Sequence, residues 1–358
     1  MATHSIHSTI TLLLFGLTAC IEPVSLPIRQ TERRLVVEGL ITNEPPPYPI
    51  KLTYSGNLQS NLLIPEELAI NGAVVFVSDD AGNRARLEQD PLNPAFYWMR
   101  DPALRGQPGR RYSLSVQLPD GKRYVSKPEL MPTVAALEPL NVQYRRQRQE
   151  LAQPDVYDIR INTQDPPTPG NYYRWASYGY LLRWAGTDPL SNPPRNSTFP
   201  VGCSTCTCWV PYYGPLGEVL SDALINGNRI ANRLVWSAPV YAIGPQYVEV
   251  RQFSLTRDAF QYWQRYEQQS NRTGSLFDAQ PASIEGNVRQ AGDDTTRLAL
   301  GYFGASAVSR QRVTIPGDTL NYDRFLILFG PKFIPPGNCL SAYPQSQLEP
   351  PLGWPPRR

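Results

Sequence analysis

The segment Arg34-Leu-Val-Val-Glu-Gly-Leu-Ile-Thr42 leads into the breaker Asn43-Glu-Pro-Pro-Pro47 and then into Ile50-Lys-Leu-Thr-Tyr54. The last run alternates apolar and polar residues, as a strand with one buried face does. Proline lacks the backbone N–H that a strand ladder requires, so the three prolines mark a connection between strands. The segment therefore predicts two β-strands at the start of a mostly β protein.

Further runs of the same kind follow. Asp120-Gly121 separates two of them, and Asp-Gly between alternating runs is a strong hairpin signal. The turn Asp79-Asp80-Ala81-Gly82-Asn83 ends another run. Strands at this spacing predict an N-terminal β-sandwich of the immunoglobulin or transthyretin-like kind over residues 34–134. The predicted strands are 34–42, 50–54, 73–78, 111–118 and 123–126.

Residues 135–340 predict a second β-rich domain that contains one helix. Thr256 can cap this helix, and Ala259, Tyr262 or Trp263, and Tyr266 recur at three- and four-residue steps over residues 256–270. The dense aromatic run Tyr172-Tyr-Arg-Trp-Ala-Ser-Tyr-Gly-Tyr180 is either a ligand platform or, more commonly, core and cross-strand packing. The other predicted strands are 140–144, 155–162, 299–303, 311–315 and 322–329, and residues 341–358 form a Pro-rich tail.

The first 19 residues predict a signal peptide. The apolar run Ile10-Thr-Leu-Leu-Leu-Phe-Gly-Leu17 is too short for a membrane-spanning helix and suits a secretory leader. Small residues precede the cysteine in Leu17-Thr-Ala-Cys20, so cleavage before Cys20 would expose a thiol that can accept a diacylglycerol. The alternative is an ordinary signal peptide with an incidental cysteine. We expect a membrane anchor through lipid on Cys20, followed by a tether over residues 20–33.

Composition excludes several classes of function. The net charge is +3 with 18% charged residues and no block of like charge, so the sequence lacks a nucleic-acid-binding footprint. Both histidines, His4 and His7, lie within the predicted signal peptide. A mature chain without histidine excludes Ser-His-Asp and Cys-His catalysis and removes the commonest zinc ligand. We therefore expect no enzyme activity, no catalytic residues, no cofactor and no metal.

Four cysteines remain after lipidation: Cys203, Cys206, Cys208 and Cys339. A zinc site built from four thiolates is one interpretation. A lipoprotein matures in an oxidising compartment, where thiols become disulfides. We therefore expect two disulfides, one within the cluster and one joining it to Cys339, with the pairing left open because four cysteines allow three connectivities.

The chain resembles the lipoproteins grouped as domain-of-unknown-function family 4249 in Bacteroidota. The resemblance covers nearly all of the mature chain and rests on the following motifs: Leu35-Val-Val-Glu-Gly39, Asp120-Gly-Lys122, Asn171-Tyr-Tyr173, Ala259-Phe-Gln-Tyr-Trp263, Gly274-Ser-Leu-Phe-Asp278 and Gly301-Tyr-Phe-Gly-Ala-Ser306. One departure is the end of the chain, where Gly353-Trp-Pro-Pro356 replaces the family's Pro-x-Phe-Trp-like ending. The resemblance implies a lipid-anchored outer-membrane protein associated with TonB-dependent transporters.

These observations favour a ligand-binding or accessory subunit of a TonB-dependent nutrient transporter. Rings and guanidinium groups dominate recognition, which makes Tyr178, Tyr180, Arg183 and Trp184 the candidate contact residues.

Two other functions are kept open. A structural or adhesive surface protein would use the same sandwich and disulfides. A hydrolase with two carboxylates needs a converging pair such as Asp278 with Glu285, whereas Asp79-Asp80 and Asp293-Asp294 lie in sequences typical of turns.

Overall fold

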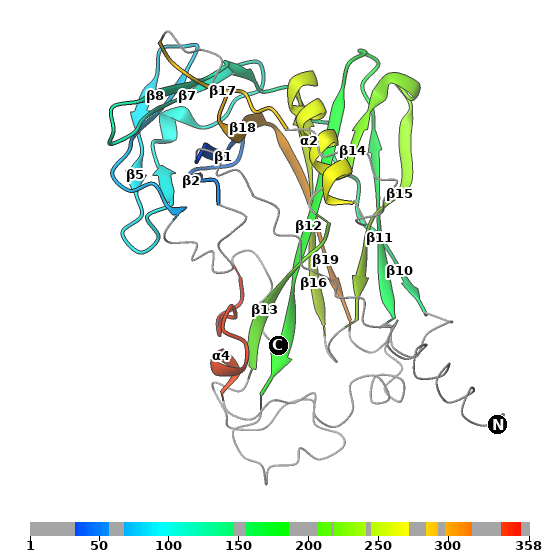
Figure 1. Cartoon of the computed structure of the whole chain (residues 1–358). Helices are drawn as coiled ribbons and strands as arrows, with labels where there is room; N and C mark the ends of the chain where they lie inside the picture. Colours follow the sequence, from blue (N-terminus) through cyan, green and yellow to red (C-terminus); the bar gives the residue numbers. More distant parts are fainter. Residues whose placement is uncertain are drawn as a thin grey trace, which may run out of the picture.

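The computed structural model describes residues 33–56, 68–146, 155–185, 207–215, 218–240, 245–271, 284–292, 298–316 and 338–351. Over these ranges the protein is mainly β, with four sheets and two α-helices (Figure 1), which confirms the predicted fold class. The helices are α2 (Arg257–Ser270), at the predicted place, and the short α4 (Cys339–Ala342). Two short 3-10 helices, η3 (Pro102–Leu104) and η4 (Asp222–Leu224), lie in connections between strands.

Two sheets form the first sandwich. Sheet A has the order β18 (Leu300–Ser306), β1 (Leu35–Thr42), β2 (Tyr48–Tyr54), β6 (Phe96–Met99) and β5 (Glu88–Gln89). Sheet B has the order β17 (Val288–Gln290), β8 (Arg123–Ser126), β7 (Arg111–Gln117), β3 (Val74–Asp79) and β4 (Arg84–Arg86), with β9 (Glu129–Leu130) also paired to β7.

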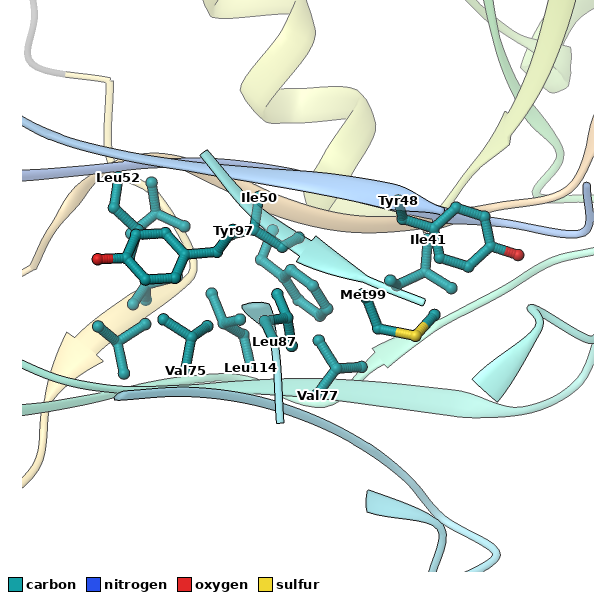
Figure 2. Close-up of a cluster of buried hydrophobic side chains, with 14 of the residues drawn as sticks. Ile41, Tyr48, Ile50, Leu52, Val75, Val77, Leu87, Tyr97, Met99 and Leu114 are labelled. Carbon is teal, nitrogen blue, oxygen red and sulfur yellow. The ribbon is translucent and has the colours of Figure 1, made fainter. Parts of the chain in front are cut away.

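The core of this sandwich comes from strand alternation. In β1, Val37 and Ile41 are fully buried, whereas Glu38 between them is exposed. Inward-facing side chains of sheet A such as Ile50 meet Val77 and others from sheet B (Figure 2). The same figure shows that a helix lies on the other side of the β1–β2 layer, away from this core.

The second sandwich packs sheet C against sheet D. Sheet C has the order β10 (Asn141–Arg145), β11 (Val156–Gln164) and β15 (Arg229–Pro239). Sheet D has the order β13 (Thr207–Tyr213), β12 (Tyr172–Trp184), β16 (Gln246–Leu255) and β19 (Val308–Ile315), with β14 (Glu218–Ser221) also paired to β12. Tyr173 and Trp175 of the aromatic strand are buried in the core between these sheets, with Ile159 and Trp236 opposite.

One extended segment, residues 300–315, belongs to both sandwiches. Its first half, β18, pairs in parallel with β1 from Val36↔Leu300 to Thr42↔Ser306. After Ala307 its second half, β19, pairs antiparallel with β16 in sheet D. Together with β17, this segment returns to the first sandwich from far beyond residue 134, where the sequence places the boundary.

The connection between the sandwiches is also held by buried side chains. Gln252 donates to Ala135 O at 2.8 Å, and Ser254 donates to Pro132 O at 2.8 Å. Both donors are almost completely buried on β16. Satisfied buried hydrogen bonds of this kind fix one arrangement of the chain. The two sandwiches are therefore joined by a rigid connection and not by a free linker.

A disulfide joins Cys208 on β13 to Cys339 at the start of α4, 131 residues later, with a Cα–Cα distance of 5.8 Å. It ties the beginning of the predicted tail to sheet D, where Trp209 N also donates to Gln347 O at 2.8 Å. Cys203 and Cys206 lie outside the described residues, as do Cys20 and the predicted strand at 322–329. In the described part of the chain, no helix is long and apolar enough to cross a membrane.

Gly301 controls how closely β18 approaches β1. Its φ is +81°, and a Cβ added there would lie 2.0 Å from Val37 O. We expect Gly301→Ala to lower the free energy of unfolding by clearly more than the about 1–2 kcal/mol that a left-handed alanine costs. Urea denaturation measures this difference. Gly82→Ala is the matched control, because Gly82 has φ +88° and nothing within 4 Å. Equal losses in the two variants would show that the contact with β1 has no energetic weight.

Removing the long-range disulfide is expected to destabilise the fold. Cys339→Ser should lower the free energy of unfolding by about 2–5 kcal/mol, because the bridge restricts a long loop in the unfolded chain. Urea denaturation with and without a reducing agent measures it. The reducing agent should destabilise the wild type more than the variant. An identical response of both proteins would contradict this role for the bridge.

Candidate functional site

A groove of about 680 Å³ lies between the outer face of sheet A and helix α2. Strand alternation turns Val36, Glu38 and Leu40 of β1 into the groove, because their neighbours Val37 and Ile41 fill the sandwich core. The opposite wall is α2, and the floor is the part of β12 and β18 that lies between them. A cavity of this size accommodates a small organic molecule.

Helix α2 contributes an aromatic wall. Thr256 caps its first turn by accepting a hydrogen bond from Ala259 N at 3.2 Å. The helix then presents Tyr262, Trp263 and Tyr266 to the groove at helical spacing. Tyr262 contacts the ring of Tyr302 on β18 with centroids 4.9 Å apart, so the helix is packed onto the bridging segment.

Arg174 of β12 lies at the base of the groove without a charged partner. No hydrogen bond or ion pair to its guanidinium occurs among the described residues, and its Nε is buried. Its Cζ lies 3.9 Å from the centroid of the Trp263 ring and 4.8 Å from that of Phe253. Burial lowers the pKa of Arg174 to about 10, so the side chain remains charged at neutral pH. The aromatic rings offset part of the cost of burial but satisfy none of the N–H donors.

The rim of the groove carries one ion pair. Lys51 Nζ lies 3.3 Å from Glu38 Oε1, and both side chains are substantially exposed. Phe96 of β6 adds an aromatic ring on the same side. Because the two rim charges balance, the described residues that line the groove carry a net charge of one, which is the positive charge of Arg174. The arrangement can bind an anionic group at its base and an apolar or ring-shaped body along its walls.

A buried carboxylate fixes helix α2 to the first sandwich. Glu129 of β9 is 5% exposed and accepts hydrogen bonds from Thr256, the cap of α2, and from Tyr302 Oη at 3.0 Å. Asn287 approaches the same carboxylate at 3.5 Å. Burial raises the pKa of Glu129 because it disfavours the charged form, and the hydrogen bonds oppose that shift. The groove walls are thus held in place by a buried polar cluster.

The predicted contact residues Tyr178 and Tyr180 lie farther along β12, on the face that carries the groove arginine. Tyr178 Oη donates to Glu249 Oε1 at 2.7 Å, and this fully buried carboxylate also pairs with Arg251 at 2.5 Å and with Arg312. Burial alone would raise the pKa of Glu249, but these hydrogen bonds and the charge of Arg251 outweigh burial and lower it. Tyr178 therefore belongs to a satisfied internal network.

The structure places Arg183 on the opposite face of β12. Its guanidinium lies over the ring of Tyr343 at 5.7 Å, beside the Cys208–Cys339 disulfide. The side chain of Trp184 lies outside the described part of the structure. The four predicted contact residues are thus not gathered in one place, and ligand contact through them stays a prediction.

The carboxylates considered for a hydrolase are not brought together within the described ranges. Asp79 accepts hydrogen bonds from Ala81 N at 3.0 Å and Asn83 N at 2.9 Å, and pairs with Arg110 at 2.8 Å, which is the geometry of a turn. Asp80 accepts a hydrogen bond from Arg111 N at 3.1 Å, and Glu285 is exposed. The other candidates, Asp278, Asp293 and Asp294, lie outside the described residues. No group of metal-ligating side chains occurs in the described part of the chain.

Sequence reasoning missed the groove itself. Arg174 stands in the aromatic run at 172–180, and a lone arginine among rings in a predicted strand is a signal that would have pointed to it. The sequence pattern of α2 indicates only the spacing of its aromatic residues along a helix and not the surface that they face. Their partner surface, the outer face of sheet A, depends on contacts between residues more than 200 positions apart.

A family model described as "Domain of unknown function (DUF4249)" matches residues 21–312. No curated protein matches the chain.

Similar solved structures include a mutant of Salmonella alpha-2-macroglobulin. The sequence identity is 12%, the match covers 65% of this chain and 14% of that chain, and the TM-score is 0.17. The chicken interferon gamma receptor alpha chain matches with 10% identity, coverage of 63% and 91%, and a TM-score of 0.16. A tandem repeat from the extending region of a large adhesion protein matches with 11% identity, coverage of 78% and 50%, and a TM-score of 0.16.

The Glu129 cluster predicts a pH-dependent contribution to stability. A carboxyl whose folded pKa is raised holds its proton more tightly in the folded state than in the unfolded state. Its contribution is therefore fully present below the unfolded value of 4.5 and is lost as the pH rises through the folded pKa. We expect the unfolding free energy of the wild type, relative to Glu129→Gln, to fall as the pH rises from about 4 to about 8. Denaturation at several pH values measures it, and a difference that is constant or rises with pH would contradict the assignment.

Proposed function

We propose that this chain, which belongs to the DUF4249 family, is a lipid-anchored outer-membrane lipoprotein that serves as a ligand-binding or accessory subunit of a TonB-dependent nutrient transporter. The observation that supports ligand binding most strongly is the groove between sheet A and α2, with the unpaired Arg174 at its base. An internal ion pair would satisfy this charge if its role were structural, as happens to the other buried charge on the same face, Glu249.

The lipid anchor in this proposal rests on Leu17-Thr-Ala-Cys20. Lipid on Cys20 would hold the two sandwiches close to a bilayer surface, where captured ligand can be passed to a transporter. The absence of histidine from residues 20–358 favours a binding role over hydrolysis through imidazole, and a hydrolase would have to use a pair of carboxylates instead.

A structural or adhesive surface protein remains the second candidate. Two rigidly joined sandwiches and a disulfide that closes a 131-residue separation suit such a role equally well. The groove favours binding, because an adhesive scaffold has no need for an unpaired arginine inside an aromatic cavity.

Affinity purification from native membranes tests the proposal. The full chain with a C-terminal tag should partition with the membrane fraction, carry a lipid adduct on Cys20 by mass spectrometry, and co-purify with an outer-membrane β-barrel transporter. Cys20→Ser is the matched control, and we expect it to lose the lipid, the membrane association and the transporter. Recovery of the lipidated wild type without any β-barrel protein would reject the accessory role, and an unmodified Cys20 would reject the anchor.

A further inference from the structure

We infer that the groove between sheet A and α2 binds a small organic acid, with the carboxylate of the ligand on Arg174 and its ring-shaped body against Tyr262 and Trp263. This inference rests on the proposed ligand-binding function and specifies the chemistry of the ligand.

Arg174 differs from the other buried or stacked arginines of this protein. Arg233 also lies over a tryptophan ring, with its Cζ 4.8 Å from the centroid of Trp175, and yet it pairs with Glu218 at 2.9 Å. Arg251 lies over Tyr178 and pairs with Glu249. Stacking on a ring therefore does not prevent pairing with a carboxylate in this fold. Arg174 has the same kind of stacking, and no carboxylate of the described residues pairs with it.

The geometry of the Arg174 guanidinium favours a carboxylate over a neutral oxygen as the group that binds it. The Cζ of Arg174 lies over the rings of Trp263 and Phe253, and these rings satisfy none of the N–H donors of the guanidinium. A carboxylate is planar and matches two parallel donors of this fork, which makes it a stronger partner than a neutral oxygen. Arg174 is half-buried with its Nε inaccessible, and a charge-assisted pair at such a position is stronger than on the open surface.

The walls of the groove favour an apolar, ring-shaped body for the remainder of the ligand. Tyr262, Trp263 and Tyr266 form an aromatic wall, and Leu40 and Phe96 add apolar surface on the side of sheet A. Flat rings bury much area against such walls at little entropic cost. The volume of about 680 Å³ accommodates a body of two or more fused rings.

The rim favours a single negative charge on the ligand. Glu38 is the acidic side chain that lines the groove, and its pair with Lys51 at 3.3 Å leaves no net charge at the rim. A second carboxylate on the ligand would therefore be repelled by Glu38, and the cation at the rim, Lys51, is already paired. The expected ligand is a monoacid with a largely apolar ring body.

Calorimetric titration with two matched probes tests the inference on the full chain. The probes are 2-naphthoate and 2-naphthalenemethanol, which share the ring system and differ in the charged group. We expect the wild type to bind the acid about 10- to 100-fold more tightly than the alcohol. Arg174→Met should bind both probes equally, and Arg174→Lys should keep only part of the preference, since lysine retains the charge and loses the fork.

Arg84→Met is the matched control for the loss of one positive charge. Arg84 is exposed on β4, outside the groove, and its Cζ lies 4.0 Å from the centroid of the Phe76 ring. This variant should keep the full preference for the acid. Urea denaturation of Arg174→Met gives a second readout: a ligand-binding role predicts stability equal to or above that of the wild type, because the variant removes an unpaired buried charge.

The outcomes separate the inference from the proposed function. Equal binding of both probes by the wild type would overturn the inference and leave a ligand-binding groove in place. Failure of 2-naphthoate to bind the wild type would overturn the inference at this groove, whereas the transporter association is tested independently by co-purification. Loss of the preference for the acid in Arg84→Met would show that the preference comes from the general charge of the protein, and it would overturn the inference. Marked destabilisation by Arg174→Met would show that Arg174 has a role in folding, and it would overturn the inference as well.

Discussion

The parallel pairing of β18 with β1 is the contact on which the rest of this structure depends. It completes sheet A with a strand that lies more than 250 residues later in the chain, and the same extended segment continues into sheet D as β19. Helix α2 packs on Tyr302 of this segment, and its cap residue Thr256 donates a hydrogen bond to Glu129 of the first sandwich. Both walls of the groove therefore depend on the pairing of β18 with β1. A groove between two units acts as a binding site only if its walls keep their separation, and this pairing provides that constraint.

The polar interior of the protein shows how unusual Arg174 is. Buried Glu249 pairs with two arginines and a tyrosine, and buried Gln252 bonds both Trp175 and the connection between the sandwiches. Buried polar groups cost free energy unless they are satisfied, and this chain satisfies these. Among the described residues, the buried Nε atoms of Arg160, Arg174 and Arg233 have no hydrogen-bond partner. Arg160 and Arg233 still pair with a carboxylate through another nitrogen, whereas no such pair is found for Arg174 at the base of the groove. Local departures of this kind are expected where a structure gives up stability for function.

The sequence predicted the elements well and their assembly poorly. Local alternation was enough for β1, β3, β7 and β8, and helical spacing with a Thr cap was enough for α2. The return of residues 288–306 to the first sandwich could not be foreseen, because parallel pairing between distant strands leaves no local pattern. The prediction grouped Tyr178 with Arg183 along one strand, but an odd separation puts them on opposite faces. Which cysteine of the cluster bonds to Cys339 could not be predicted from the sequence, and in the structure it is Cys208.

A crystal of the full chain soaked with 6-bromo-2-naphthoate would show where the acid binds, since the anomalous signal of bromine locates the ring without ambiguity. We expect the carboxylate of the ligand on the N–H donors of Arg174 and the bromine along the aromatic face of α2. Bromine bound elsewhere, or Arg174 found paired with a carboxylate of the chain itself, would contradict it.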